Sequence, residues 1–60
     1  MKPFISVTQG MSGWFAVLYS ADAEGEYEPE QTGIGRFATR DEAVEEATFW
    51  AGDEGIELRI

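Results

Sequence analysis

Carboxylates are the side chains of this sequence that could do chemistry, and in one segment their spacing is regular. In DAEGEYEPE, residues 22–30, every second residue is an acid: Asp22, Glu24, Glu26, Glu28 and Glu30. In an extended chain, residues two apart point the same way and lie about 6–7 Å apart. That spacing is comparable with the distance between successive phosphates of a nucleic-acid strand. The acidic row is therefore either a set of charges that imitates phosphates or a mobile loop that keeps a small protein in solution.

A second set of acids lies on a predicted helix. Glu42, Glu45 and Glu46 fall opposite its core-facing side, Phe49 lies in their middle, and Asp53 follows just past the predicted end. An exposed aromatic side chain ringed by carboxylates is typical of an interface anchor with a charged rim. In the alternative interpretation, the sheet or the acidic loop covers Phe49, and the acids form an ordinary solvated face.

Other chemistry is disfavoured by composition. The 60 residues include no cysteine and no histidine, so the chain lacks the commonest general base and the commonest transition-metal ligand. Ser6, Ser12 and Ser20 have no histidine to activate them, and we expect no enzyme activity and no cofactor. The acidic row does not fit a calcium-binding EF-hand loop, because Gly25 falls at position 4 and Gly33 at position 12, so no metal site is expected.

The charge is strongly negative and unevenly distributed. Twelve acids face four bases, for a net charge of −8, and all the acids lie from Asp22 onward. Such a field repels nucleic acid and anionic membranes and attracts basic protein surfaces. Direct nucleic-acid binding is therefore not expected. No apolar run approaches the roughly 18–20 residues of a membrane helix, and the N-terminus lacks the features of a signal peptide, which predicts a cytosolic protein.

The elements that must position these side chains are one helix and several strands. FISVTQ and WFAVLYSA predict strands over residues 4–9 and 14–21, with GMSG as the turn between them. The acidic segment 22–32 is expected to be a loop, because Gly25 and Pro29 interrupt any regular ladder. IGRFA predicts a third strand over 34–38, and IELRI a last one over 56–60, with Ile56, Leu58 and Ile60 facing the core.

The helix is expected from about Arg40 to Ala51, with Gly52 as its C-terminal stop. Thr39 and Glu42 fit the capping box at its start. The core-facing side is rich in alanine, so the helix can lie close to the sheet. Its members are Ala43, Val44, Ala47, Trp50 and Ala51.

The predicted fold is α+β. A small antiparallel sheet of three to four strands carries one helix on one face, in the order β-β-(β)-α-β, and residues 1–60 form a single domain. The strand over 14–21 is apolar on both of its faces. Because the single helix can cover only one of them, the second face is a candidate partner site or dimer interface.

A resemblance supports this fold. The GW dipeptide with its apolar strand, FATRDEAVEEATFWA and the closing IELRI resemble the small β-β-α-β domains of bacterial and phage proteins, over residues 13–60. The acidic insertion at 22–32 departs from the shorter hairpin of that pattern. In size, acidity and lack of cysteine and histidine, the chain is similar to phage-encoded inhibitors, above all the anti-CRISPR proteins, several of which act as DNA mimics.

That similarity implies a stoichiometric inhibitor in the host bacterial cytoplasm, and a basic partner such as a subunit of a CRISPR effector complex. Asp22, Glu24, Glu26, Glu28 and Glu30 would form one bank of carboxylates. Glu42, Glu45, Glu46 and Asp53 would form the other, with Phe49 or Tyr27 as an apolar anchor. The alternative is a protein-binding module that mimics nothing, as a monomer or as a homodimer joined through the second face of the 14–21 strand.

Overall fold

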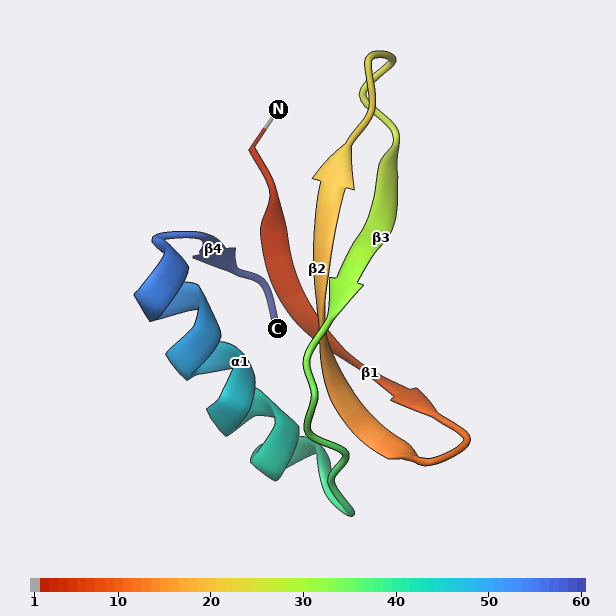
Figure 1. Ribbon diagram of the computed structural model, residues 1–60, viewed down its shortest axis with the longest axis vertical. Coiled ribbons are helices and arrows are strands. Elements are labelled where there is room, and N and C mark those ends of the chain that lie inside the picture. Colours follow the sequence, from red (N-terminus) through yellow and green to blue (C-terminus); the bar gives the residue numbers. More distant parts are fainter. Residues whose placement is uncertain (1) are drawn as a thin grey trace.

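The computed structural model describes residues 2–60, which form a four-stranded sheet and one helix (Figure 1). In chain order the elements are β1 Phe4–Gly10, β2 Gly13–Ala21, β3 Tyr27–Thr32, α1 Arg40–Glu54 and β4 Glu57–Leu58. The strands lie in the order β3-β2-β1-β4, and α1 packs against β1, β2 and β4 on one face of the sheet. The predicted α+β class with one helix on a small sheet is confirmed.

The hairpin of β1 and β2 forms the centre of the sheet. The two strands pair in antiparallel register from Phe4 opposite Tyr19 to Gly10 opposite Gly13. Gly13 has a backbone φ of 120°, which residues other than glycine rarely adopt. A Cβ atom at Gly13 would also meet the carbonyl oxygen of Phe37, so this position needs glycine on two grounds.

β4 makes the sheet mixed rather than antiparallel as predicted. It pairs in parallel with β1, with Phe4 opposite Glu57 and Ile5 opposite Leu58. A tight hairpin forces antiparallel pairing, whereas a strand that returns through a helix can enter the sheet in either direction. β4 is also shorter than the predicted strand over 56–60, and Ile60, which was expected in the core, is 54% exposed.

β3 corrects the prediction of a loop over 22–32, since Tyr27–Thr32 pairs antiparallel with β2. Edge strands tolerate a proline, because only one side of the strand needs its ladder hydrogen bonds, and Pro29 lies on such an edge. The register shifts between Leu18 and Tyr19, which pair with Gln31 and Pro29, so Glu30 is the additional residue of a β-bulge.

The predicted strand over 34–38 is wrong. Only an isolated bridge forms there, in which Trp14 and Phe37 exchange backbone hydrogen bonds of 2.8 and 2.9 Å. β3 already occupies the free edge of β2, so the segment after Gly33 has little edge left to pair with. It crosses instead from the sheet to the start of α1 (Figure 1).

α1 begins as predicted and ends one turn later. The Thr39 side chain accepts a hydrogen bond from the Glu42 backbone N–H, and the Glu42 side chain accepts one from the Thr39 backbone N–H, which is the predicted capping box. The helix continues through Gly52 to Glu54, and Gly55 caps it with a φ of 68°. A glycine inside a helix costs only about 1 kcal/mol relative to alanine, so Gly52 does not end α1.

The core lies between α1 and the sheet. Ala43, Ala47 and Ala51 are buried as predicted, and these small side chains let the helix lie close to the strands. Val44 and Trp50 are only half-buried. The core cluster consists of Ile5, Ala16, Ala47 and Ala51, with Val7, Leu18, Trp50, Ile56 and Leu58 packed around it.

The second face of the sheet has no helix over it in residues 2–60, and aromatic side chains cover it instead. The Phe4 ring stacks on Tyr19 with a centroid distance of 5.1 Å and meets the edge of Tyr27 at 4.8 Å. The Arg59 guanidinium lies 4.4 Å from the Phe4 ring centroid. Part of the apolar face of β2 is thus closed by the chain's own side chains.

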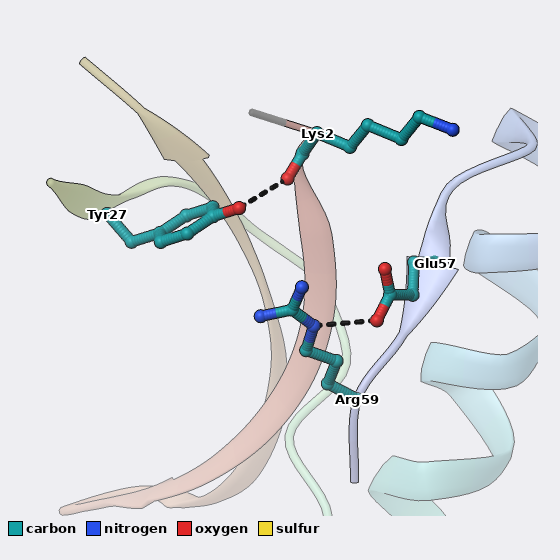
Figure 2. Close-up of polar contacts among 4 residues, drawn as sticks. All are labelled: Lys2, Tyr27, Glu57 and Arg59. Carbon is teal, nitrogen blue, oxygen red and sulfur yellow. Dashed lines mark hydrogen bonds and ion pairs between the residues drawn. The ribbon is translucent and has the colours of Figure 1, made fainter. Parts of the chain in front are cut away.

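Two polar contacts fix this aromatic cluster (Figure 2). The Tyr27 hydroxyl donates a 2.7 Å hydrogen bond to the Lys2 carbonyl oxygen. Arg59 Nε donates to Glu57 Oε2 at 2.7 Å, in an ion pair with both side chains about half exposed. Hydrogen bonding from Arg59 lowers the pKa of Glu57 below its ordinary value, and Glu57 in turn raises the pKa of Arg59.

Candidate functional site

The acidic side of α1 is the most distinctive exposed surface of the chain. Phe49 is 76% exposed, so the interpretation in which the sheet or the acidic loop covers it is wrong. Glu42, Glu45 and Asp53 are exposed around it, and Glu46 is half-buried. The helical spacing of these five residues places carboxylates on both sides of an aromatic ring, as the sequence predicts.

A groove runs beside Phe49, between α1 and the end of β3. It encloses about 510 Å³, and its walls are formed by Gln31–Ile34 on one side and by Glu46, Phe49, Trp50 and Asp53 on the other. Ile34 is 99% exposed. The groove exists because α1 packs over β1, β2 and β4 and leaves β3 to one side.

Ile34 is the site residue that sequence reasoning missed. It was expected inside a strand, where its side chain would have been covered. The signal that could have found it is the glycine on each side, GIG at 33–35, because an isoleucine between two glycines is poorly suited to a regular strand. In the structure this isoleucine extends the apolar surface of Phe49 across the groove.

The carboxylate of Glu46 lies against the backbone at both of these glycines. A Cβ atom at Gly33 would collide with Glu46 Oε1, and one at Gly35 would collide with Oε2 and with the Phe37 ring. Oε1 is buried and has no hydrogen-bond partner among the described residues. A buried carboxylate oxygen without a donor is unfavourable, so the backbone at Gly33 and Gly35 holds the Glu46 carboxylate in place at a cost in stability.

The other bank, Asp22 to Glu30, is exposed but does not form a straight row. The Asp22 carboxylate accepts hydrogen bonds from the backbone N–H groups of Glu24, at 2.8 Å, and Glu26, at 3.0 Å, and so closes the β2–β3 turn. Glu28 lies on β3 opposite Ser20, and the bulge at Glu30 breaks the two-residue period. The turn extends beyond the sheet and away from α1 (Figure 1), so the structure does not bring the two banks together.

The bases lie away from the acidic helix face. The Arg36 guanidinium lies 4.4 Å from the Phe15 ring centroid and donates through Nη1 to the carbonyl oxygens of Gly33 and Gly35. Arg59 lies over Phe4 on the second sheet face. Arg40 is nine residues before Phe49 on the helix, which puts it about 180° around the axis.

Tyr27, the alternative anchor, belongs to the aromatic cluster of the second sheet face. Its ring contacts Phe4 and its hydroxyl is bound to Lys2. It therefore lies apart from Phe49 and from the groove, and of the two predicted anchors only Phe49 projects among carboxylates.

Comparison with protein-family models, with curated proteins and with solved structures finds no match to this chain. Residues 2–60 contain no group of three or more acidic side chains placed to hold a metal ion. In the same range no helix is both long enough and apolar enough to cross a membrane. The exposed surface of α1 offers an aromatic anchor, a groove and a rim of carboxylates.

Proposed function

We propose that the chain is a stoichiometric inhibitor that binds a basic surface of a bacterial nucleic-acid-binding defence complex, and that a CRISPR effector is its target. The observation that carries the proposal is the exposed Phe49 among the carboxylates of Glu42, Glu45, Glu46 and Asp53, on a helix face without a base. A surface that holds phosphates presents arginine and lysine side chains, and these pair equally well with carboxylates. Binding would exclude nucleic acid without any turnover, in the host cytoplasm where such complexes act.

The aromatic anchor distinguishes this surface from a merely soluble one. Exposed ion pairs contribute about 0–1 kcal/mol each, so carboxylates alone give fast association but little affinity. A large apolar side chain that becomes buried at the centre of an interface contributes much more. Phe49 has that position within its rim of acids, which supports a protein partner rather than a diffuse counter-ion cloud.

The test is inhibition of DNA binding by purified CRISPR effector complexes, followed by the fluorescence anisotropy of a labelled target duplex. We expect one effector class to lose DNA binding when the chain is present in equal amounts. The double variant Glu45→Gln/Asp53→Asn should inhibit roughly fivefold less well at low salt. The matched control Glu24→Gln/Glu28→Gln makes the same change in net charge on the other bank and should leave inhibition by the helix face intact.

Two outcomes would contradict the proposal. If both double variants weakened inhibition equally, total charge rather than the helix face would be responsible. If no effector complex lost DNA binding, the target class would be wrong.

A second candidate function is a protein-binding module that associates through the second face of the sheet. The aromatic cluster there, with Phe4, Tyr19 and Tyr27 in contact and no helix above it, favours this candidate. A homodimer joined by that face would persist in high salt and dissociate on Tyr19→Ser, in sedimentation equilibrium. A monomer under both salt conditions would remove the homodimer from consideration.

A further inference from the structure

The groove between α1 and the 31–34 segment has features that a flat acidic surface lacks. Its volume of about 510 Å³ is within the range of sites that enclose side chains or small ligands. Two large apolar side chains, Ile34 and Phe49, stand 99% and 76% exposed at its walls. A small protein rarely leaves two such side chains in solvent around one groove unless something packs on them.

The groove is also negatively charged from within. Glu46 contributes the buried, unpartnered oxygen Oε1, Asp53 is exposed in the wall, and the lining contains no lysine or arginine. The groove therefore presents carboxylates next to apolar walls. A guest that complements both has a cationic N–H donor and an apolar surface side by side.

Phe49 separates this groove from a second hollow. The second hollow encloses about 440 Å³ and is lined by Glu45, Thr48, Phe49, Gly52 and Asp53. A Cβ atom at Gly52 would meet nothing within 4 Å, so packing inside the chain does not require glycine there. Phe49 therefore borders a hollow on each side, and a guest can approach its ring from both of them.

We infer that this groove binds a partner segment in which an arginine stands beside an apolar side chain. This inference rests on the proposed function and specifies what the acidic helix face recognises. The guanidinium would donate to the Glu46 carboxylate and lie on the Phe49 ring, while the apolar neighbour would pack on Ile34. Arginine fits better than lysine, because its planar group stacks on aromatic rings and donates two parallel hydrogen bonds to a carboxylate.

A second copy of the chain is a poorer occupant. Two of its three arginines, Arg36 and Arg59, already lie over aromatic rings and donate hydrogen bonds within their own chain. The third, Arg40, stands between Thr39 and Asp41 and has no apolar residue beside it in the sequence. A metal ion is also a poorer occupant, because the groove offers it apolar walls where it would need several oxygen ligands. Both remain outcomes that the experiment separates.

The test is an NMR titration of the isotope-labelled chain with three blocked hexapeptides. One alternates arginine and leucine, the second alternates arginine and serine, and the third alternates glutamate and leucine. We expect saturable shifts from the arginine–leucine peptide at Ile34, Glu46 and the Trp50 indole. The Trp14 indole, outside the groove, serves as the internal control. The arginine–serine peptide should bind at least about fivefold more weakly, because it loses the apolar contact.

Variants locate the binding in the groove. Phe49→Ser and Ile34→Ser should each lower the affinity for the arginine–leucine peptide at least about fivefold. The matched control is Met11→Ser, which removes an even more exposed apolar side chain from the β1–β2 turn. Glu46→Gln should weaken binding, whereas Glu54→Gln, on the same helix but outside the groove, should not.

Several results would overturn the inference. Equal binding of the arginine–leucine and arginine–serine peptides would show that only charge is recognised. Shifts centred on residues 22–30 would place the site on the other bank. Concentration-dependent shifts at Ile34, Glu46 and the Trp50 indole without peptide would identify a second copy as the occupant, and shifts at the same positions with magnesium chloride alone would identify a cation.

The inference and the proposed function can fail separately. If Ile34→Ser and Glu46→Gln still inhibit an effector fully while Phe49→Ser and Glu45→Gln/Asp53→Asn inhibit it less well, the function stands and the groove inference is wrong. If the peptide binds in the groove and no effector complex is inhibited, the groove inference stands and the target class is wrong.

Discussion

At the scale of single residues, acids that look equivalent in the sequence have different roles. Asp22 and Glu24 are two positions apart in one regular row. The Asp22 carboxylate accepts two backbone hydrogen bonds and closes the β2–β3 turn, whereas the Glu24 carboxylate has no such contact among the described residues. Only the structure separates an acid that shapes the turn from one that is free to meet a partner.

This difference can be measured as stability. Asp22→Ala should lower the free energy of unfolding by about 1 kcal/mol, because two backbone N–H groups lose their acceptor. Glu24→Ala changes the net charge by the same amount and should leave stability nearly unchanged. Urea denaturation of both variants tests the prediction, and equal losses would show that the turn does not depend on the Asp22 carboxylate.

The ion pair of Glu57 and Arg59 predicts a pH effect. Hydrogen bonding from Arg59 lowers the pKa of Glu57, so Arg59→Gln should raise that pKa towards its ordinary value. Arg36→Gln is the control, because Arg36 lies over Phe15 and not beside Glu57. NMR titration of the Glu57 carboxyl carbon measures the pKa directly, and an identical pKa in both variants would contradict the contact.

The lowered pKa of Glu57 also makes the stability of the fold depend on pH. A carboxyl group whose pKa is lowered by folding stabilises the fold above its unfolded pKa and loses that contribution as the pH falls through its folded pKa. The stability difference between the natural chain and Arg59→Gln should therefore narrow in acid. It should not vanish, because the contact of Arg59 with the Phe4 ring does not depend on the protonation of Glu57.

At the scale of elements, the two glycines near the end of α1 have opposite roles. Gly52 lies within the helix and would meet nothing if it gained a side chain, whereas Gly55 caps the helix with a φ of 68°. A glycine inside a helix destabilises the helix, whereas a cap in the left-handed conformation needs glycine. The backbone therefore requires glycine at position 55, whereas packing inside the chain does not require it at position 52.

Substitution by alanine separates the two glycines. Gly52→Ala should raise the free energy of unfolding by about 0.5–1 kcal/mol, because alanine is the better helix former. Gly55→Ala should lower it by about 1 kcal/mol, because alanine is strained at positive φ. Thermal and urea unfolding measure both. A destabilising Gly52→Ala would show that packing inside the chain does require glycine at this position.

At the scale of the whole molecule, the net charge of −8 sets the response to salt. The acidic helix face and the β2–β3 turn repel themselves and each other through solvent, and salt screens this repulsion. We expect the melting temperature to rise between low and physiological salt. The variant Glu45→Gln/Asp53→Asn, with two charges removed, should show a smaller rise. A melting temperature that fell with added salt would contradict a concentrated negative surface.

Much of the fold could be predicted because it depends on neighbours along the chain. The capping box at Thr39 and Glu42, the hairpin turn around Gly13 and the alanine-rich face of α1 are all local patterns, and the structure confirms them. The helical spacing that surrounds Phe49 with carboxylates is local too. Each of these features follows from backbone geometry and the periodicity of a single element.

The sequence by itself thus determined the fold class, the start of the helix, the central hairpin and the acidic face of α1. Tertiary structure alone decided that β3 occupies the free edge of β2, that β4 runs parallel to β1, and that Arg59 covers the Phe4 ring. It also decided that Ile34 lies across a groove from Phe49, with the carboxylate of Glu46 between Gly33 and Gly35. Those contacts join residues far apart in the chain, and their energy depends on which edges and faces remain free once the helix has packed.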